Sequence, residues 1–159
     1  MTWRGSTDGT DRLFGALLYI FPLIDVLPFS QFMFQQFPQL AFIYLPLQPL
    51  IAFYYGFPFA GFIIFLLLFM AVVRNERISH FIRFNAMQSI LIGILLILCQ
   101  LALGILVRGL GGGLLVETLY NVIFLGTLAA CFYCIIQSAL GRYAEIPTIS
   151  EAAYTQIPR

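Results

Sequence analysis

The chain has few charged residues for its length. Only 9% of its 159 residues are charged, whereas 61% are hydrophobic, and a soluble domain carries about a quarter of its residues as charges. So few charges cannot cover the water-facing surface of a globule of this size. Much of the surface must therefore face lipid, which predicts an integral membrane protein with the bilayer as its first partner.

Lysine is absent, and the eight basic residues are all arginine. The net charge is only +1, whereas nucleic-acid binding needs a clustered basic face and a strongly basic balance. The sequence therefore predicts no nucleic-acid partner. A guanidinium forms paired hydrogen bonds with phosphate and is weakly hydrated, which suits arginine to sites near lipid headgroups.

Residues that commonly carry chemistry are also scarce. His80 is the only histidine, so a multi-histidine metal site is excluded. Cys131 and Cys134 have the spacing of a redox or metal pair, but they lie in an apolar segment, where thiols act as small packing groups. The glycine-rich residues 109–113 follow a membrane helix rather than a strand and are interpreted as a turn. The sequence thus predicts no enzyme activity, no catalytic residue, no cofactor and no metal.

Long uncharged runs predict an all-α bundle of four transmembrane helices in a single membrane domain, residues 1–159. A spanning helix needs about 20 mostly apolar residues. Residues 86–107 and 119–140 meet this criterion without any charge. Residues 50–73 do so with Pro58 inside, where a kink is expected because proline leaves one helical carbonyl unbonded.

The first span, residues 13–34, is harder to define. Only 12 residues separate Arg12 from Asp25, and a helix of that length covers about 18 Å of a hydrocarbon core about 30 Å thick. Either the helix continues past Asp25, or a short, tilted or re-entrant element is completed by the residues after it. Residues 29–55, rich in Phe, Gln and Pro, are predicted to form an interfacial segment with short helical pieces. A fifth span is the alternative for that segment.

The placement of arginine predicts which side of the membrane the chain ends face. With four spans, one side carries seven of the eight arginines and the other carries only Arg108. Because loops on the cytoplasmic side are enriched in arginine, both termini, including the tail 141–159, are predicted to face the cytoplasm or, in a plastid, the stroma. An odd number of spans would remove this asymmetry.

The most specific segment lies just before and within the third predicted span. Asn75 is predicted to cap a helix, and a polar and aromatic stripe then descends about one turn into the membrane. Two interpretations remain open: a membrane-surface helix whose arginines contact headgroups, or a packing or partner-docking surface. The stripe consists of Arg74, Asn75, Arg77, His80, Phe81, Arg83, Phe84, Asn85 and Gln88.

Asp25 is the second informative position. A carboxylate at membrane depth costs about 2.5–3.5 kcal/mol, so it usually has a partner or a function. Arg108 ends the third span and Glu117 precedes the fourth, and both are predicted on the same outer side as Asp25. We hypothesise an outer-side polar cluster of Asp25, Arg108 and Glu117; three separately solvated interfacial charges are the alternative.

Three stretches together carry a family resemblance. The run at 72–91 reads VVRNERISHFIRFNAMQSIL, and the run at 141–147 reads GRYAEIP. The first span adds Asp11, Arg12, Leu13, Tyr19, Pro22, Leu23 and Asp25. Over nearly the whole chain, these features resemble the small, twenty-kilodalton, four-span subunit family of the translocon at the inner envelope of chloroplasts. Transit peptides are rich in Arg and Ser and poor in acidic residues, and Asp8 near the start does not fit one. In this respect the chain resembles a cyanobacterial or plastid-encoded member of the family.

The resemblance implies a membrane-embedded part of a machine that imports precursor proteins. It places the chain in a cyanobacterial plasma membrane or a chloroplast inner envelope. Other membrane subunits or further copies of the chain, and translocating polypeptides, are the implied partners. Separately from the resemblance, four helices rich in Phe and Leu cannot enclose a wet, polypeptide-wide pore, so any conduction needs several copies or other subunits. The alternative function is a non-conducting structural or assembly factor that binds other membrane proteins through the stripe.

Overall fold

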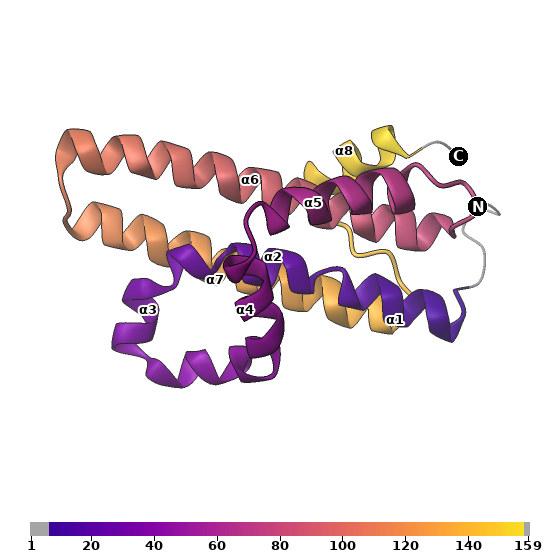
Figure 1. Ribbon diagram of the computed structural model, residues 1–159, viewed down its shortest axis with the longest axis horizontal. Helices are drawn as coiled ribbons and strands as arrows, with labels where there is room; N and C mark the ends of the chain where they lie inside the picture. The colour runs from indigo at the N-terminus through magenta and orange to yellow at the C-terminus, as the bar shows by residue number, and fades with distance from the viewer. Residues whose placement is uncertain (1–6, 158–159) are drawn as a thin grey trace.

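The computed structural model describes residues 7–157, and its regular elements there are all helices (Figure 1). The predicted all-α fold class is confirmed for this part of the chain. In chain order the elements are α1 (Gly9–Leu17), α2 (Ile20–Asp25), η1 (Leu27–Phe29), α3 (Gln31–Gln36), η2 (Pro38–Leu47), α4 (Gln48–Gly56), α5 (Ala60–Leu67), η3 (Leu68–Val73), α6 (His80–Leu110), α7 (Leu114–Ala139) and α8 (Ile149–Gln156).

The two longest helices, α6 and α7, form an antiparallel hairpin (Figure 1). Their 31 and 26 residues rise about 46 and 39 Å, more than the thickness of a hydrocarbon core of about 30 Å. Both are apolar enough to cross a membrane. The predicted span 86–107 lies within α6, and the predicted span 119–140 lies within α7 except for Leu140, its C-cap residue. The glycine turn predicted at 109–113 is shorter than expected: α6 continues to Leu110, and the chain reverses at 111–113, where Gly111 has a φ of 77° that suits glycine.

The predicted first span, residues 13–34, is divided into short helices. It begins at Gly9, where the side chain of Asp8 caps α1 by accepting a hydrogen bond from the backbone N–H of Asp11 (3.2 Å). The segments α1, α2 and η1 run along α6 and α7, and the chain then leaves the bundle at α3 (Figure 1). The part that lies along the hairpin is therefore 9–29, which rises about 30 Å.

Prolines explain why this element breaks and why the break is tolerated. Pro22 and Pro28 have no N–H to donate, so the carbonyls four residues earlier lose their helical partners. The Ser89 hydroxyl on α6 donates to the carbonyl of Leu18 at 2.8 Å. The Tyr55 hydroxyl on α4 donates to the carbonyl of Ile24 at 2.8 Å. Neighbouring elements thus satisfy the carbonyls that proline frees, as a membrane interior requires.

Residues 30–59 form a loop of short helices beside the bundle (Figure 1). The expected short helical pieces are present as α3, η2 and α4. Aromatic rings hold this loop against α7: Phe34 lies edge-on to Phe124 with ring centroids 5.5 Å apart, and Phe32 lies edge-on to Tyr120 at 5.6 Å. Such edge-to-face pairs are favoured arrangements of aromatic rings.

The predicted second span, residues 50–73, is broken rather than kinked. The helical segments Pro38–Gly56 and Ala60–Val73 differ in direction by 103°, because the turn between them contains Pro58 and places Phe59 in the left-handed region at φ 60°. Of this predicted span, η3 packs on α6, and η3 is π-helical. Since Ala60–Val73 rises about 21 Å, it is shorter than a hydrocarbon core.

One end of the bundle gathers most of the arginines. The Thr7 hydroxyl donates to the carbonyl of Gly141 (3.2 Å). The Ser79 hydroxyl donates to Asp11 Oδ1 (2.8 Å). These bonds bring the starts of α1 and α6 to the end of α7. Of the arginines within 7–157, those at this end are Arg12, Arg74, Arg77, Arg83 and Arg142, whereas Arg108 lies at the opposite end.

The segment after α7 folds back onto the bundle. The chain turns at Gly141, whose φ is 75°, and α8 packs on α6 (Figure 1). Ala144 and Ala153 are completely buried, and Ile157 is nearly so. The part of the predicted tail 141–159 that the structure describes is therefore a packed element.

Candidate functional site

The stripe begins in the loop before α6. Arg74 and Arg77 are exposed. The prediction that Asn75 caps the helix is wrong: its side-chain oxygen accepts the backbone N–H of Arg77 at 3.0 Å in a local turn. The helix starts five residues later, where the Ser79 hydroxyl accepts the backbone N–H of Ile82 at 3.3 Å. Ser79 is thus the cap, because its backbone is extended there while that of the next residue is helical.

Within α6 the stripe is an internal packing surface. Phe84, Asn85 and Gln88 are completely buried, and Phe81 and Arg83 are 2% and 4% exposed. The Arg83 Nε donates to the carbonyl of Val73 at 2.9 Å. Of the arginines in the interpretation of a surface helix whose arginines contact headgroups, Arg83 is therefore excluded by its burial, whereas Arg74 and Arg77 are exposed. The buried members of the stripe cannot reach a partner in this conformation either.

Asn85 is the centre of a buried hydrogen-bond network. Its side-chain oxygen accepts from the hydroxyls of Tyr19 (2.7 Å) and Ser138 (3.1 Å). Its amide donates to the carbonyl of Phe81 (2.9 Å). One side chain of α6 thereby joins the first membrane element to α7.

Gln88 extends this network by one turn of α6. Its amide nitrogen donates to the Tyr19 hydroxyl (3.0 Å) and to the carbonyl of Ala144 (2.8 Å). The Sγ of Cys134 lies 3.4 Å from the same nitrogen. The network therefore links α6 to the segment after α7. Tyr19, Ser138 and Ala144 were not predicted as parts of it, because isolated polar groups in apolar runs give no indication of which helix they meet.

Aromatic side chains of the stripe dock the end of the chain. Phe84 stacks on Tyr154 of α8 with centroids 4.6 Å apart and contacts Tyr143 at 5.1 Å. His80 Nδ1 lies 3.0 Å from the hydroxyl of Tyr143. The stripe thus receives the chain's own C-terminal segment.

The predicted cluster of Asp25, Arg108 and Glu117 does not form. Asp25 lies against Gly93 of α6, and Arg108 is fifteen residues further on, which is about 22 Å along a helix. Glu117 accepts a hydrogen bond from the Gln36 amide at 2.6 Å, and Arg108 is exposed. Asp25 lies further from the outer end of its element than predicted, because the chain continues along the hairpin past it through η1. Its carboxylate lies against Gly93, near the middle of α6.

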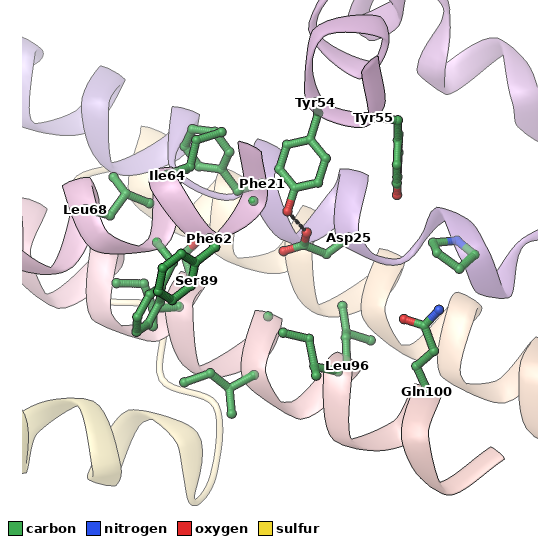
Figure 2. A pocket seen from close by; sticks show the side chains of 17 residues that line it. Phe21, Asp25, Tyr54, Tyr55, Phe62, Ile64, Leu68, Ser89, Leu96 and Gln100 are labelled. Carbon is green, nitrogen blue, oxygen red and sulfur yellow. Dashed lines mark hydrogen bonds between the residues drawn. The ribbon is translucent and has the colours of Figure 1, made fainter. Parts of the chain in front are cut away.

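Asp25 instead faces a pocket between α2, α4, α5 and α6 (Figure 2). Tyr54 donates its hydroxyl hydrogen to Asp25 Oδ1. The cavity has a volume of about 510 Å³. Its other polar residues are Tyr55, Ser89 and Gln100, and the remaining walls are aromatic and aliphatic. A single carboxylate therefore opens into a largely apolar cavity.

The cysteine pair lies in the packed core. Cys131 and Cys134 are completely buried and carry free thiols. Within residues 7–157 no three His, Cys, Asp or Glu side chains lie close enough together to hold a metal ion. The two cysteines lie on one face of α7, where they act as small packing groups against the first element.

The fold and the buried polar network define a multi-pass, all-α membrane protein built on an α6–α7 hairpin. Residues 10–153 match the family described as chloroplast import apparatus Tic20-like, and the chain belongs to this family. The resemblance noted in the sequence is thereby confirmed.

The relatives come from cyanobacteria and plastids. The chain is 61% identical to a Tic20 family protein of Synechocystis sp. over 99% of both chains. It is 32% identical to Protein TIC 20-II, chloroplastic, of Arabidopsis thaliana over 99% of this chain and 78% of that one. It is 38% identical to the Tic20 family protein Ycf60 of Gracilaria tenuistipitata var. liui over 92% of this chain and 75% of that one. The family is described by a part in protein import rather than by a reaction.

Proposed function

We propose that this protein is a membrane subunit of a protein-translocation machine and acts there with other subunits or further copies. The observation that carries the proposal is the family match over residues 10–153, which covers every element from α1 into α8. The family is described as chloroplast import apparatus Tic20-like, and two relatives are named as chloroplastic TIC 20 proteins. The proposed location is a cyanobacterial plasma membrane or a chloroplast inner envelope.

A single copy has no room for a polypeptide inside the bundle. The space between the first element and the α6–α7 hairpin is filled by buried Tyr19, Leu23, Leu96, Phe124 and Leu128. A passage for a polypeptide must be hydrated. Conduction would therefore take place between copies or between this chain and other subunits.

We propose four crossings for this chain: α1 with α2, α5 with η3, α6, and α7. The two broken elements run along the hairpin and alternate in direction with it. Five of the six arginines within 7–157 lie at one end, which supports a cytoplasmic or stromal position for that end.

The second candidate function is a non-conducting assembly factor. The packed interior favours this function, because the described residues form no continuous polar lining from one end of the bundle to the other. The stripe is buried in this fold, so a partner would have to dock elsewhere, for example on the aromatic loop 30–59.

Stalled translocation distinguishes the two candidates. Native membranes carrying a tagged copy of the chain would receive a precursor fused to a tightly folded domain, which stops halfway. We expect the stalled precursor to co-purify with the tagged chain after cross-linking and to be released when the domain is unfolded. A membrane lacking the chain that translocates the precursor at the normal rate would contradict the proposal and favour the assembly role.

A further inference from the structure

With the proposed crossings, the pocket of Asp25 lies near the middle of the bilayer. It faces Gly93, ten residues from Arg83 at the basic end of α6, which is about 15 Å along the helix and half of a core about 30 Å thick. Three of its lining residues, Phe62, Ile94 and Ile97, are also exposed on the outer surface. The cavity therefore opens sideways toward lipid rather than toward water.

The carboxylate in this pocket is only half satisfied. Asp25 Oδ1 accepts the hydrogen bond from Tyr54, whereas Oδ2 points at Gly93, which has no side chain. Within the part of the chain that the structure describes, Oδ2 has no hydrogen-bond donor. None of the lining residues is basic. The site thus holds a carboxylate without a cationic partner of its own.

The surroundings of the carboxylate suit an organic cation. The rings of Phe21, Tyr54, Tyr55 and Phe62 line the same cavity (Figure 2), and aromatic faces attract ammonium and guanidinium groups. A carboxylate deep in a membrane is expected to pair with a charged or polar partner. The aliphatic walls, among them Ile64 and Leu68, would accommodate the apolar stem that carries the cation.

We propose that this pocket binds the side chain of a single lysine or arginine on an apolar peptide segment that has entered the bilayer. The peptide is favoured over a lipid because headgroups stay at the membrane surface, whereas a side chain on a membrane helix can bring a cation to this depth. The inference deepens the proposed function, on which it rests for the origin of the peptide.

The full-length chain, purified into phosphatidylcholine nanodiscs, tests the proposal. The probes are two apolar helical peptides that differ only in a central residue, lysine or glutamine. A photo-cross-linking phenylalanine derivative, which keeps an aromatic ring, replaces Phe62 in the wall of the pocket or, as the control, Val122 on α7; each of these side chains is 60% exposed. From position 62 we expect about tenfold more cross-linking of the lysine peptide than of the glutamine peptide, as one desolvated cation contact provides. From position 122 we expect equal cross-linking.

Variants assign the preference to the carboxylate. Asp25→Asn keeps the size and an acceptor for Tyr54, and it should lower the tenfold preference to about one. Glu117→Gln removes a carboxylate outside the pocket and should leave the preference intact. Tyr54→Phe frees the second carboxylate oxygen and should retain or increase the preference, which tests the site even if Asp25→Asn does not fold.

Several results would overturn the proposal. These are equal cross-linking of both peptides from position 62, a lysine preference that survives Asp25→Asn, or its loss in Tyr54→Phe. Phosphatidylethanolamine in the nanodisc that abolishes the lysine signal would assign the pocket to a lipid amine instead. A stalled precursor that fails to co-purify, together with an intact lysine preference, would contradict the proposed function and leave the pocket's chemistry standing.

Discussion

At the residue scale, hydroxyl groups repair the backbone where proline interrupts it. Pro22 leaves the carbonyl of Leu18 without its helical donor, and Ser89 on another helix supplies one at 2.8 Å. In water a solvent molecule could take this place, but the hydrocarbon core offers none. A serine in an apolar helix is thereby tied to a proline sixty-seven residues earlier.

A double-mutant cycle on Pro22 and Ser89 measures this repair. Ser89→Ala should lower the free energy of unfolding by about 1 kcal/mol, because a buried carbonyl loses its donor. In the Pro22→Ala background the backbone N–H returns, so Ser89→Ala should cost close to nothing. Unfolding in mixed micelles gives the four stabilities. Additive effects would show that the hydroxyl does not replace the missing N–H. Thr118→Ala, whose exposed hydroxyl bonds within its own helix, is the control.

Two asparagines in the long helices differ in the hydrogen bonds of their side chains. Asn85 bonds with Tyr19, Ser138 and Phe81, whereas the side-chain oxygen of Asn121 is buried without a hydrogen-bond partner among residues 7–157. Asn85→Leu should reduce the free energy of unfolding by about 2 kcal/mol, since the buried hydroxyls of Tyr19 and Ser138 lose the acceptor to which they donate. Asn121→Leu should be neutral or stabilising, since it removes an unpaired oxygen. Equal losses for both variants, measured by the same unfolding assay, would contradict the network.

At the element scale, the break between α4 and α5 depends on one residue in an unusual conformation. Phe59 is 80% exposed, and its backbone is in the left-handed region at φ 60°. Residues with a side chain adopt this conformation with strain, whereas glycine does not. The break directs α4 across the bundle, so that Tyr54 and Tyr55 reach α2. The geometry of the pocket therefore depends on this turn.

Replacing Phe59 by glycine tests the strain. Phe59→Gly should raise the free energy of unfolding by about 1 kcal/mol, because the left-handed backbone is relaxed for glycine. Phe57→Gly is the control: Phe57 is also exposed but extended at φ −101°, so glycine there should only destabilise. A loss of stability in Phe59→Gly as large as that in the control would mean that the turn carries no strain.

How much of the fold could be predicted depended on the kind of element. The cores of α6 and α7 were predicted because long uncharged runs have few alternatives in a membrane protein. For the first span, the alternative of a short element completed by the residues after it agrees with the division into α1, α2 and η1. The 103° break near Pro58 was predicted only as a kink, because the effect of a proline depends on whether distant groups can bond with the freed backbone. The sequence placed Asp25 in a cluster at the outer interface, and its partner Tyr54 could be found only once the direction of α4 was known.

At the scale of the whole molecule, the arginines mark one end of the bundle. Arg77 lies in the loop before α6, and Gly113 lies in the turn at the other end of the hairpin. If the proposed crossings are right, these two positions lie on opposite sides of the membrane, with Arg77 in the cytoplasm or stroma.

Accessibility labelling checks this topology. In intact cells, a membrane-impermeant maleimide should modify Gly113→Cys and leave Arg77→Cys unlabelled. In inverted vesicles the pattern should reverse. The parent protein, in which Cys131 and Cys134 are buried, measures the background. Labelling of both positions from the same side would refute the four-crossing arrangement.

The buried network also has a consequence for biosynthesis. Tyr19 bonds with Asn85 and Gln88, which are 66 and 69 residues further along the chain, and Gln88 bonds with Ala144 after a further interval of 56. While the ribosome is still extending the polypeptide, the earliest segment to enter the bilayer has none of these contacts. The first helix to enter the bilayer therefore waits for later segments before this hydrogen-bond network is complete. Nascent chains that stop short of residue 144 lack part of the network and should be substrates for membrane proteases.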